Sequence, residues 1–218
     1  MKNIIFIAPP AAGKGTQSKL ISMEYNIPHI STGDLLRDEV EMGTTLGKMI
    51  KSEIDLGNLI SDDIIVNLLR KRISKVDCNN GYILDGYPRN LDQAITYENL
   101  LRDLGINIGT VIFLDIDMEL ALKRTMSRTV CSVCGSSFNS TDPNLCPKID
   151  GICDKCGHVL IVRSDDNKET FINRFNTYIN STQPLIDYYR NKGILKQVKI
   201  LETDSVIDIF NKVKTMID

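Results

Sequence analysis

The sequence predicts an α/β fold of three layers, in which helices cover both faces of a five-stranded parallel sheet. Three observations lead to this prediction. Apolar runs of strand length recur along the 218 residues, helical patterns separate them, and a loop of small residues follows the first run. Strands that alternate with helices in this way form parallel sheets covered on both sides. The five strands are expected at residues 3–8, 28–30, 82–85, 110–115 and 197–201.

The helices of the predicted core follow from segments with helical periodicity. They are expected at residues 16–25, 62–75, 91–104, 118–128, 167–192 and 205–217. Pro184 lies inside the fifth of these segments. A proline within a helix removes one backbone hydrogen bond, so Pro184 is expected to kink or interrupt that helix.

Two segments do not fit the simple alternation and are interpreted as insertions. Residues 31–60 show helical patterning without a good strand, and residues 129–163 are rich in Cys, Gly, Asp and Pro without a helical period. The expected division is therefore a core of residues 1–30, 61–126 and 165–218. The first insertion would occupy residues 31–60 and the second residues 127–164.

Composition excludes several classes of protein. The net charge is −2, from 26 basic and 28 acidic residues, which argues against a nucleic-acid or membrane-surface binder. The apolar run near the N-terminus is shorter than the core of a signal peptide. No segment approaches the roughly 20 apolar residues of a membrane span. We expect a soluble, cytoplasmic protein.

The loop after the first strand has the character of a phosphate-binding loop. Residues 6–17 read FIAPPAAGKGTQ, so that Gly13, Lys14, Gly15 and Thr16 close the loop where a helix begins. Backbone N–H groups, a helix N-terminus and one ammonium group together bind phosphate, which makes this a P-loop (phosphate-loop) fold. The match to the usual G-x-x-x-x-G-K-[ST] pattern is imperfect, because Ala8 occupies the first Gly position and Gly15 follows Lys14 directly.

A second chemical signature lies in the second insertion. Cys131 and Cys134 form one C-x-x-C pair, and Cys153 and Cys156 form another after a gap of 18 residues. This spacing is typical of a tetrahedral zinc site whose ligands are all protein sulfurs, and such sites are structural. Free thiols and disulfides are the alternatives. Cys146 or His158 could also replace a ligand.

Further motifs accompany the phosphate loop. They are STGDLLR at residues 31–37, GNLISDD at 57–63, LDGYPR at 84–89, and Gln93. With these motifs the chain resembles the adenylate kinase family of nucleoside monophosphate kinases, in order and spacing as far as Arg174. The resemblance implies Mg²⁺-dependent transfer of the ATP γ-phosphoryl group to AMP, giving two ADP. It also implies a monomer in which the first insertion binds the monophosphate, the second is a lid, and both are mobile.

The resemblance also implies roles for individual residues. The groups surrounding the transferred phosphoryl would be Lys14, Arg89, Arg124, Arg128, Arg163 and Arg174, with Asp85 orienting Mg²⁺ through its waters. ATP would be bound by Ala11, Ala12, Gly13, Lys14, Gly15, Thr16, Arg124, Arg128, Ser137 and Phe138, the last stacking on adenine. AMP would be bound by Thr32, Arg37, Asn58, Leu59, Ile60, Gly86, Arg89, Gln93, Arg163 and Arg174. Gln93 offers both a donor and an acceptor, so it can read an amino group beside a ring nitrogen.

The family usually has Gly where this chain has Ala8 and Ala11. Pro9 and Pro10 fix their own φ near −65° on the flank of Ala11. We therefore expect negative φ at both alanines, with their methyl groups directed away from bound phosphate. Gly13 and Gly15 would then supply any unusual torsion.

Other functions remain open at this stage. Within enzymes they are a GTP-using AMP kinase or another monophosphate kinase. A zinc-stabilised nucleotide-binding switch without transferase activity would not need cations from so many motifs. A zinc-knuckle nucleic-acid binder is disfavoured because residues 129–163 carry three basic and three acidic side chains.

Overall fold

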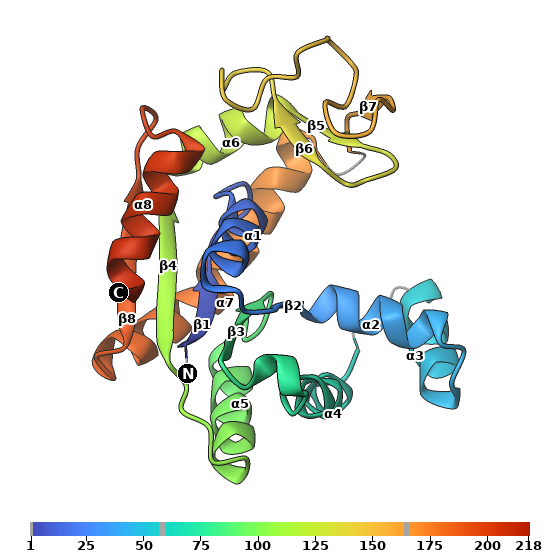
Figure 1. Ribbon diagram of the computed structural model, residues 1–218, viewed down its shortest axis with the longest axis vertical. Coiled ribbons are helices and arrows are strands. Elements are labelled where there is room, and N and C mark those ends of the chain that lie inside the picture. The colour runs from blue at the N-terminus through green and yellow to red at the C-terminus, as the bar shows by residue number, and fades with distance from the viewer. Residues whose placement is uncertain (1, 57–59, 164–165) are drawn as a thin grey trace.

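The computed structural model describes residues 2–56, 60–163 and 166–218, and within them the predicted α/β fold is confirmed (Figure 1). All neighbouring strands of the main sheet are parallel, in the order β2-β3-β1-β4-β8. The strands are β1 (Lys2–Ile7), β2 (His29–Ser31), β3 (Gly81–Asp85), β4 (Thr110–Ile116) and β8 (Leu195–Ile200). Each lies within a few residues of the expected position.

The alternation of side chains along the strands builds two apolar layers, one on each face of the sheet. In β1, Ile5 and Ile7 belong to one buried cluster, whereas Ile4 and Phe6 belong to the other. A strand whose two faces are both covered is expected to be apolar, and residues Ile4 to Ile7 of β1 are. The helices are α1 (Lys14–Tyr25), α4 (Asp62–Ile73), α5 (Leu91–Asp103), α6 (Met118–Met126), α7 (Lys168–Asn191) and α8 (Val206–Ile217).

Two of the expected helices need correction. The helix expected at 118–128 ends at Met126, and Arg128 is the first residue of strand β5. Pro184 was expected to kink or interrupt α7, and the interruption is wrong, because α7 continues through this residue as one helix of 24 residues. A kink at Pro184 stays a prediction.

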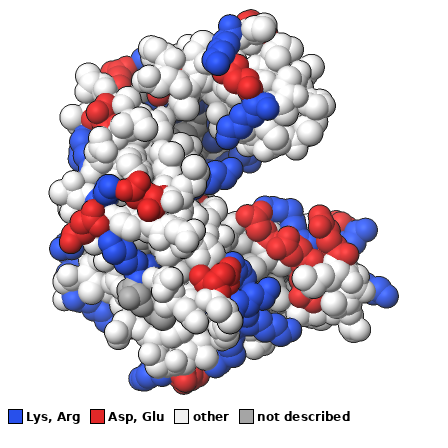
Figure 2. All heavy atoms as spheres, in the orientation of Figure 1, with Lys and Arg blue, Asp and Glu red and all other residues white. Residues whose placement is uncertain are grey.

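Both suspected insertions project from the sheet (Figure 1). β2 leads directly into α2 (Thr32–Glu41), which is followed by α3 (Thr45–Asp55). The second insertion contains a three-stranded antiparallel sheet in the order β6-β5-β7, which we call the lid sheet. Its strands are β5 (Arg128–Cys131), β6 (Ser137–Asn139) and β7 (Leu160–Ile161). Figure 2 shows the surface hollowed between these two projections.

Among the helices that the structure describes, none combines the length and apolar character needed to cross a bilayer.

Candidate active site and metal centre

The phosphate loop joins β1 to α1 and ends at Gly13, the N-cap of α1. Gly13 has a φ of 83°, in the left-handed region, and no side chain caps the helix. The first N–H groups of α1 therefore lack a side-chain cap, and together with the helix dipole they favour an anion. Gly13 supplies the unusual torsion expected of it, whereas Gly15 lies inside α1 and is not among the described glycines with positive φ.

Ala11 contradicts the expectation for this loop, because its φ is 61°. The physical reason is that Pro9 and Pro10 restrict only their own φ and leave that of Ala11 free. The loop reverses direction just before Gly13, and Ala11 takes part in this turn. Ala8 agrees with the expectation, since it is not among the described residues with positive φ. The loop thus stores strain at one alanine.

We expect the substitution Ala11→Gly to stabilise the fold by about 0.5–1 kcal/mol. Removing the strain of an alanine in the left-handed region stabilises the folded state by about 1–2 kcal/mol. The greater conformational freedom of glycine in the unfolded chain offsets part of this stabilisation. ATP binding should also become tighter. Chemical denaturation of Ala11→Gly and of the control Ala8→Gly measures the difference. Equal destabilisation by both substitutions would contradict the strain at Ala11.

Lys14 and Asp85 form an ion pair between the phosphate loop and the end of β3. The Nζ atom of Lys14 lies 2.5 Å from Asp85 Oδ1, and His29 Nε2 lies 3.0 Å from Asp85 Oδ2. Burial alone would raise the pKa of Asp85, but the His29 hydrogen bond and the charge of Lys14 together lower it to about 2. The carboxylate is therefore ionised at neutral pH. It lies at the carboxyl end of its strand, where parallel sheets bind ligands.

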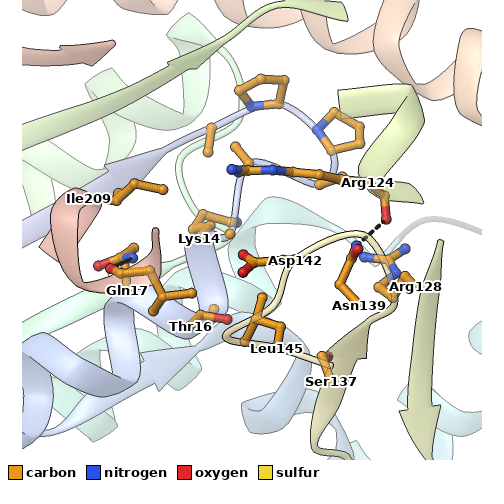
Figure 3. Close-up of a pocket in the computed structure, with 18 of the residues that line it drawn as sticks. Lys14, Thr16, Gln17, Arg124, Arg128, Ser137, Asn139, Asp142, Leu145 and Ile209 are labelled. Carbon is orange, nitrogen blue, oxygen red and sulfur yellow. Dashed lines mark hydrogen bonds between the residues drawn. The ribbon is translucent and has the colours of Figure 1, made fainter. Parts of the chain in front are cut away.

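A pocket of about 1460 Å³ opens beside the phosphate loop, and all six predicted catalytic cations line it. They are Lys14, Arg89, Arg124, Arg128, Arg163 and Arg174. Figure 3 shows Lys14 and Thr16 on one side of this pocket, with Arg124 and Arg128 on another. These side chains come from α1, the loop after β3, α6, β5, the segment after β7 and α7. Such a concentration of positive charge suits a polyphosphate.

Two of these arginines are partly buried and have acidic neighbours. Burial lowers the pKa of Arg124, while the charges of Asp142 and Asp204 act in the opposite direction. The Arg128 guanidinium donates to both carboxylate oxygens of Asp166, and its Nε atom lies 2.8 Å from Oδ2. The Asp166 side chain is only 1% exposed. Arg128 therefore links the first strand of the lid sheet to the segment that precedes α7.

The remaining predicted ATP ligands also lie at this pocket. Those that line it are Ala11, Ala12, Gly13, Gly15, Thr16, Ser137 and Phe138. Phe138 is 8% exposed, and it packs in a small apolar cluster with Cys131, Cys153 and Leu160. Stacking of Phe138 on adenine therefore stays a prediction.

Sequence reasoning did not identify two further segments of the pocket wall. Residues 202–206, which follow β8, line the pocket, and so do residues 141–146 of the second insertion. The first segment could have been found, because it follows a strand at the carboxyl edge of the predicted sheet. The second carries no motif.

The predicted AMP ligands are only partly brought together. Thr32 Oγ1 lies 3.4 Å from the carbonyl oxygen of Gly86, and Arg89 Nε donates to the same carbonyl at 2.8 Å. Gly86, Arg89, Arg163 and Arg174 line the large pocket, whereas Thr32, Arg37, Ile60 and Gln93 do not. Arg37 instead pairs with Asp34 on α2. Asn58 and Leu59 lie outside the described residues.

The four cysteines predicted to bind metal form one cluster. Their sulfur atoms all lie within 4.8 Å of one another, with Cys131 Sγ 3.4 Å from Cys156 Sγ and Cys134 Sγ 3.5 Å from Cys153 Sγ. In a tetrahedral zinc site with Zn–S of about 2.3 Å, sulfurs lie roughly 3.8 Å apart. Backbone N–H groups of Cys134 and Val133 lower the pKa of Cys131, and hydrogen bonds from Ser136 lower the pKa of Cys134 to about 6, which favours the metal-binding thiolate at both. The neighbouring Cys131 thiol raises the pKa of Cys156, against the backbone hydrogen bond from His158. The cluster therefore fits zinc.

The other cysteines take no part in this cluster. All six cysteines lie within the described residues, and each is a free thiol. Cys78 is buried, and Cys146 is exposed in the second insertion. The disulfide alternative is thus excluded for this structure.

Comparison with known proteins gives one consistent result. The family model described as adenylate kinase matches residues 6–194. The adenylate kinase of Clostridium tetani is 44% identical over 193 residues, which are 88% of this chain and 88% of that protein. That of Archaeoglobus fulgidus is 45% identical over 196 residues, covering 90% and 89%. That of Thermodesulfovibrio yellowstonii is 41% identical over 216 residues, covering 99% and 98%.

Proposed function

The chain belongs to the adenylate kinase family, and from this premise we propose which of its residues hold the two nucleotides. The activity is that of the family: phosphoryl transfer from ATP to AMP, giving two ADP. ATP would place its phosphates on the N–H groups between Ala11 and Thr16, with Lys14 on the outer phosphates. AMP would bind on the other side of Arg89, near Thr32 and Gln93.

The observation that carries this assignment is the convergence of six cations on one pocket beside the phosphate loop. Phosphoryl transfer requires little covalent help from the protein, but it requires two nucleotides held in line and the charge on the moving group offset. Arginines from separate elements can surround that group from several directions, and each can bind two phosphate oxygens. A nucleotide-binding switch would not need this arrangement.

Lys14 must exchange partners when ATP binds. In this structure its ammonium pairs with Asp85. We propose that a nucleotide phosphate replaces Asp85 as the partner of Lys14. Asp85, which is hydrogen-bonded to His29, would then be the residue that helps to hold hydrated Mg²⁺. The chemistry that Mg²⁺ supplies is neutralisation of charge on the phosphate oxygens. Asp85 suits this role because it is ionised and half-buried at the carboxyl edge of the sheet.

Zinc in the four-cysteine cluster would be structural, because protein sulfurs would fill all four positions. The second insertion contains one small apolar cluster of four buried residues, and two of them are cysteines. A metal cross-link would replace the missing core, so that residues 127–164 could move as one body. We propose that this lid and the segment at 31–60 both close over bound nucleotides.

The oligomeric state and two alternative substrates remain predictions. A monomer is expected from the resemblance. GTP is the alternative phosphoryl donor to ATP, and another monophosphate is the alternative acceptor to AMP.

A coupled assay tests these assignments by offering ATP or GTP with AMP, GMP, CMP or UMP. We expect ATP with AMP to give the highest kcat/KM. The substitution Gln93→Ala should raise the KM for AMP at least about tenfold and leave the KM for ATP within about twofold, because the two bases occupy separate sites. Equal or better turnover with UMP or CMP would refute AMP as the preferred acceptor.

A further inference from the structure

The side-chain amide of Gln93 is held at both ends. Its Oε1 atom accepts a hydrogen bond from the backbone N–H of Arg89 at 2.8 Å. Its Nε2 atom donates to Asp62 Oδ1 at 2.7 Å. Gln93 lies on the first turn of α5, and Asp62 lies on the first turn of α4. The orientation of this amide is therefore determined by contacts on the first turns of two helices, and Gln93 and Asp62 are 31 residues apart in the chain.

The orientation of the oxygen follows from the way α5 begins. Asn90 caps the helix by accepting from the N–H of Gln93 at 2.9 Å, and the Gln93 side chain reaches back to the N–H of Arg89. This reciprocal pattern is close to a capping box, in which a Gln at this position supplies an acceptor. A backbone N–H can only donate, so it selects the oxygen end of the amide.

Asp62 selects the same orientation from the other side. An ionised carboxylate can only accept, so it requires the nitrogen end of the amide. Turning the amide over would place two N–H groups against each other at Arg89 and two oxygens against each other at Asp62. The negative charge of Asp62 is itself favoured at the N-terminus of α4. The amide is thus fixed in one of its two orientations.

The remaining hydrogen-bonding capacity of Gln93 decides which base it can read. One lone pair on Oε1 and one hydrogen on Nε2 are left after the two contacts. A 6-amino purine offers an amino donor beside an acceptor ring nitrogen, which complements this pair. A 6-oxo purine offers the reverse, a carbonyl acceptor beside a ring N–H. A freely turning amide could read either base.

We propose that Asp62 is a positioning residue that selects a 6-amino purine over a 6-oxo purine in the acceptor site, through the orientation of Gln93. The proposal rests on the proposed role of Gln93 toward AMP. It goes beyond that role, because it makes part of the selectivity of Gln93 depend on the charge of Asp62, in addition to the hydrogen bond from the Arg89 N–H. Asp62 does not touch the substrate in this assignment.

The experiment compares AMP with inosine monophosphate, which differs at the 6-position and in bearing a hydrogen on the adjacent ring nitrogen. In the substitution Asp62→Asn, the new amide can accept or donate, and the charge is lost. We expect the ratio of kcat/KM for AMP to that for inosine monophosphate to fall about tenfold, the difference between an ionic and a neutral hydrogen bond. The kcat for AMP should stay within about twofold.

Asp63→Asn is the matched control. Asp63 is exposed and shares the first turn of α4, so it makes the same contribution to the helix N-terminus. Its substitution should leave the ratio unchanged. A fall of the same size in Asp63→Asn, or an equal loss for both substrates in Asp62→Asn, would overturn the proposal and leave Asp62 a structural residue.

A double-mutant cycle separates this proposal from the role of Gln93 itself. In a Gln93→Ala background, Asp62→Asn should no longer change the ratio, and a persistent change would refute action through Gln93. An unchanged KM for AMP in Gln93→Ala alone would instead refute the proposed role of Gln93. If Asp62→Asn does not fold, Gln93→Glu provides the test. A carboxylate facing Asp62 should lower kcat/KM for AMP further than Gln93→Ala does, and an equal or smaller loss would overturn the proposal.

Discussion

Replacing Lys14 by Met should lower kcat/KM for ATP and AMP by at least about a hundredfold. Lys14 is the cation of the phosphate loop, and a preorganised donor to developing charge is worth roughly 10²–10³ in rate. The effect should appear mainly in kcat, because the other cations of the pocket still bind the ground state. Steady-state kinetics with each nucleotide varied in turn measures the division between kcat and KM.

The Lys14→Met substitution should also change the pKa of Asp85. Without Lys14, the buried Asp85 carboxylate keeps only its hydrogen bond to His29, so its pKa should rise above the present value of about 2. Lys71→Met is the control, because Lys71 is exposed on α4 and does not line the pocket. It should leave kcat/KM within about twofold. Comparable activity in the two variants would show that Lys14 is not part of the phosphate site.

Replacing Cys131 by Ser should lower the melting temperature by on the order of 10 °C and reduce the zinc content of the protein. A serine hydroxyl is a poor substitute for a thiolate ligand, and structural zinc contributes strongly to the folding of small units. In a chain of this size each kcal/mol corresponds to about 2–4 °C. Some turnover should remain, because the four cysteines of the cluster do not line the pocket beside the phosphate loop. Calorimetry and metal analysis of the purified variant provide the measurement.

Cys146→Ser is the matched control for the zinc site. Cys146 lies in the same insertion, is exposed, and is absent from the four-sulfur cluster. Its substitution should change neither the zinc content nor the melting temperature by more than about 2 °C. One metal ion per chain in the wild type, lost only in Cys131→Ser, would support the assignment. A wild type that contains no metal after preparation in zinc, with an ordered lid, would refute it.

The sequence was sufficient to predict the main sheet, because its strands are apolar runs separated by long amphipathic helices. It was insufficient for the lid sheet, where strands of two to four residues show no periodicity. The boundary at Arg128 illustrates the difficulty. Helical spacing from Arg124 made both arginines part of one predicted helix, yet the helix ends at Met126 and the chain continues as a strand.

The candidate site shows the same division between local and distant information. Gly13, Lys14 and the cysteine pairs belong to local motifs. In the structure Gly13 and Lys14 line one pocket, and the four cysteines form a separate cluster. The contacts of Asp85 with His29 and of Gln93 with Asp62 join residues 56 and 31 positions apart, so no local pattern could reveal them. The prediction of a negative φ at Ala11 was wrong, because the φ restriction of Pro10 was extended to the residue that follows it.

Helix α7 connects the lid sheet to the turn that carries Arg89. It starts two residues after Asp166, which holds Arg128 of the lid sheet, and its Thr182 lies 3.4 Å from the backbone carbonyl of Arg89. The 15 residues from Lys168 to Thr182 form an unbroken lever of about 22 Å at 1.5 Å per residue. A tilt applied at the lid end therefore reaches the turn that carries Arg89. Under the proposed closure over both nucleotides, α7 would therefore couple the movement of the lid sheet to the position of Arg89.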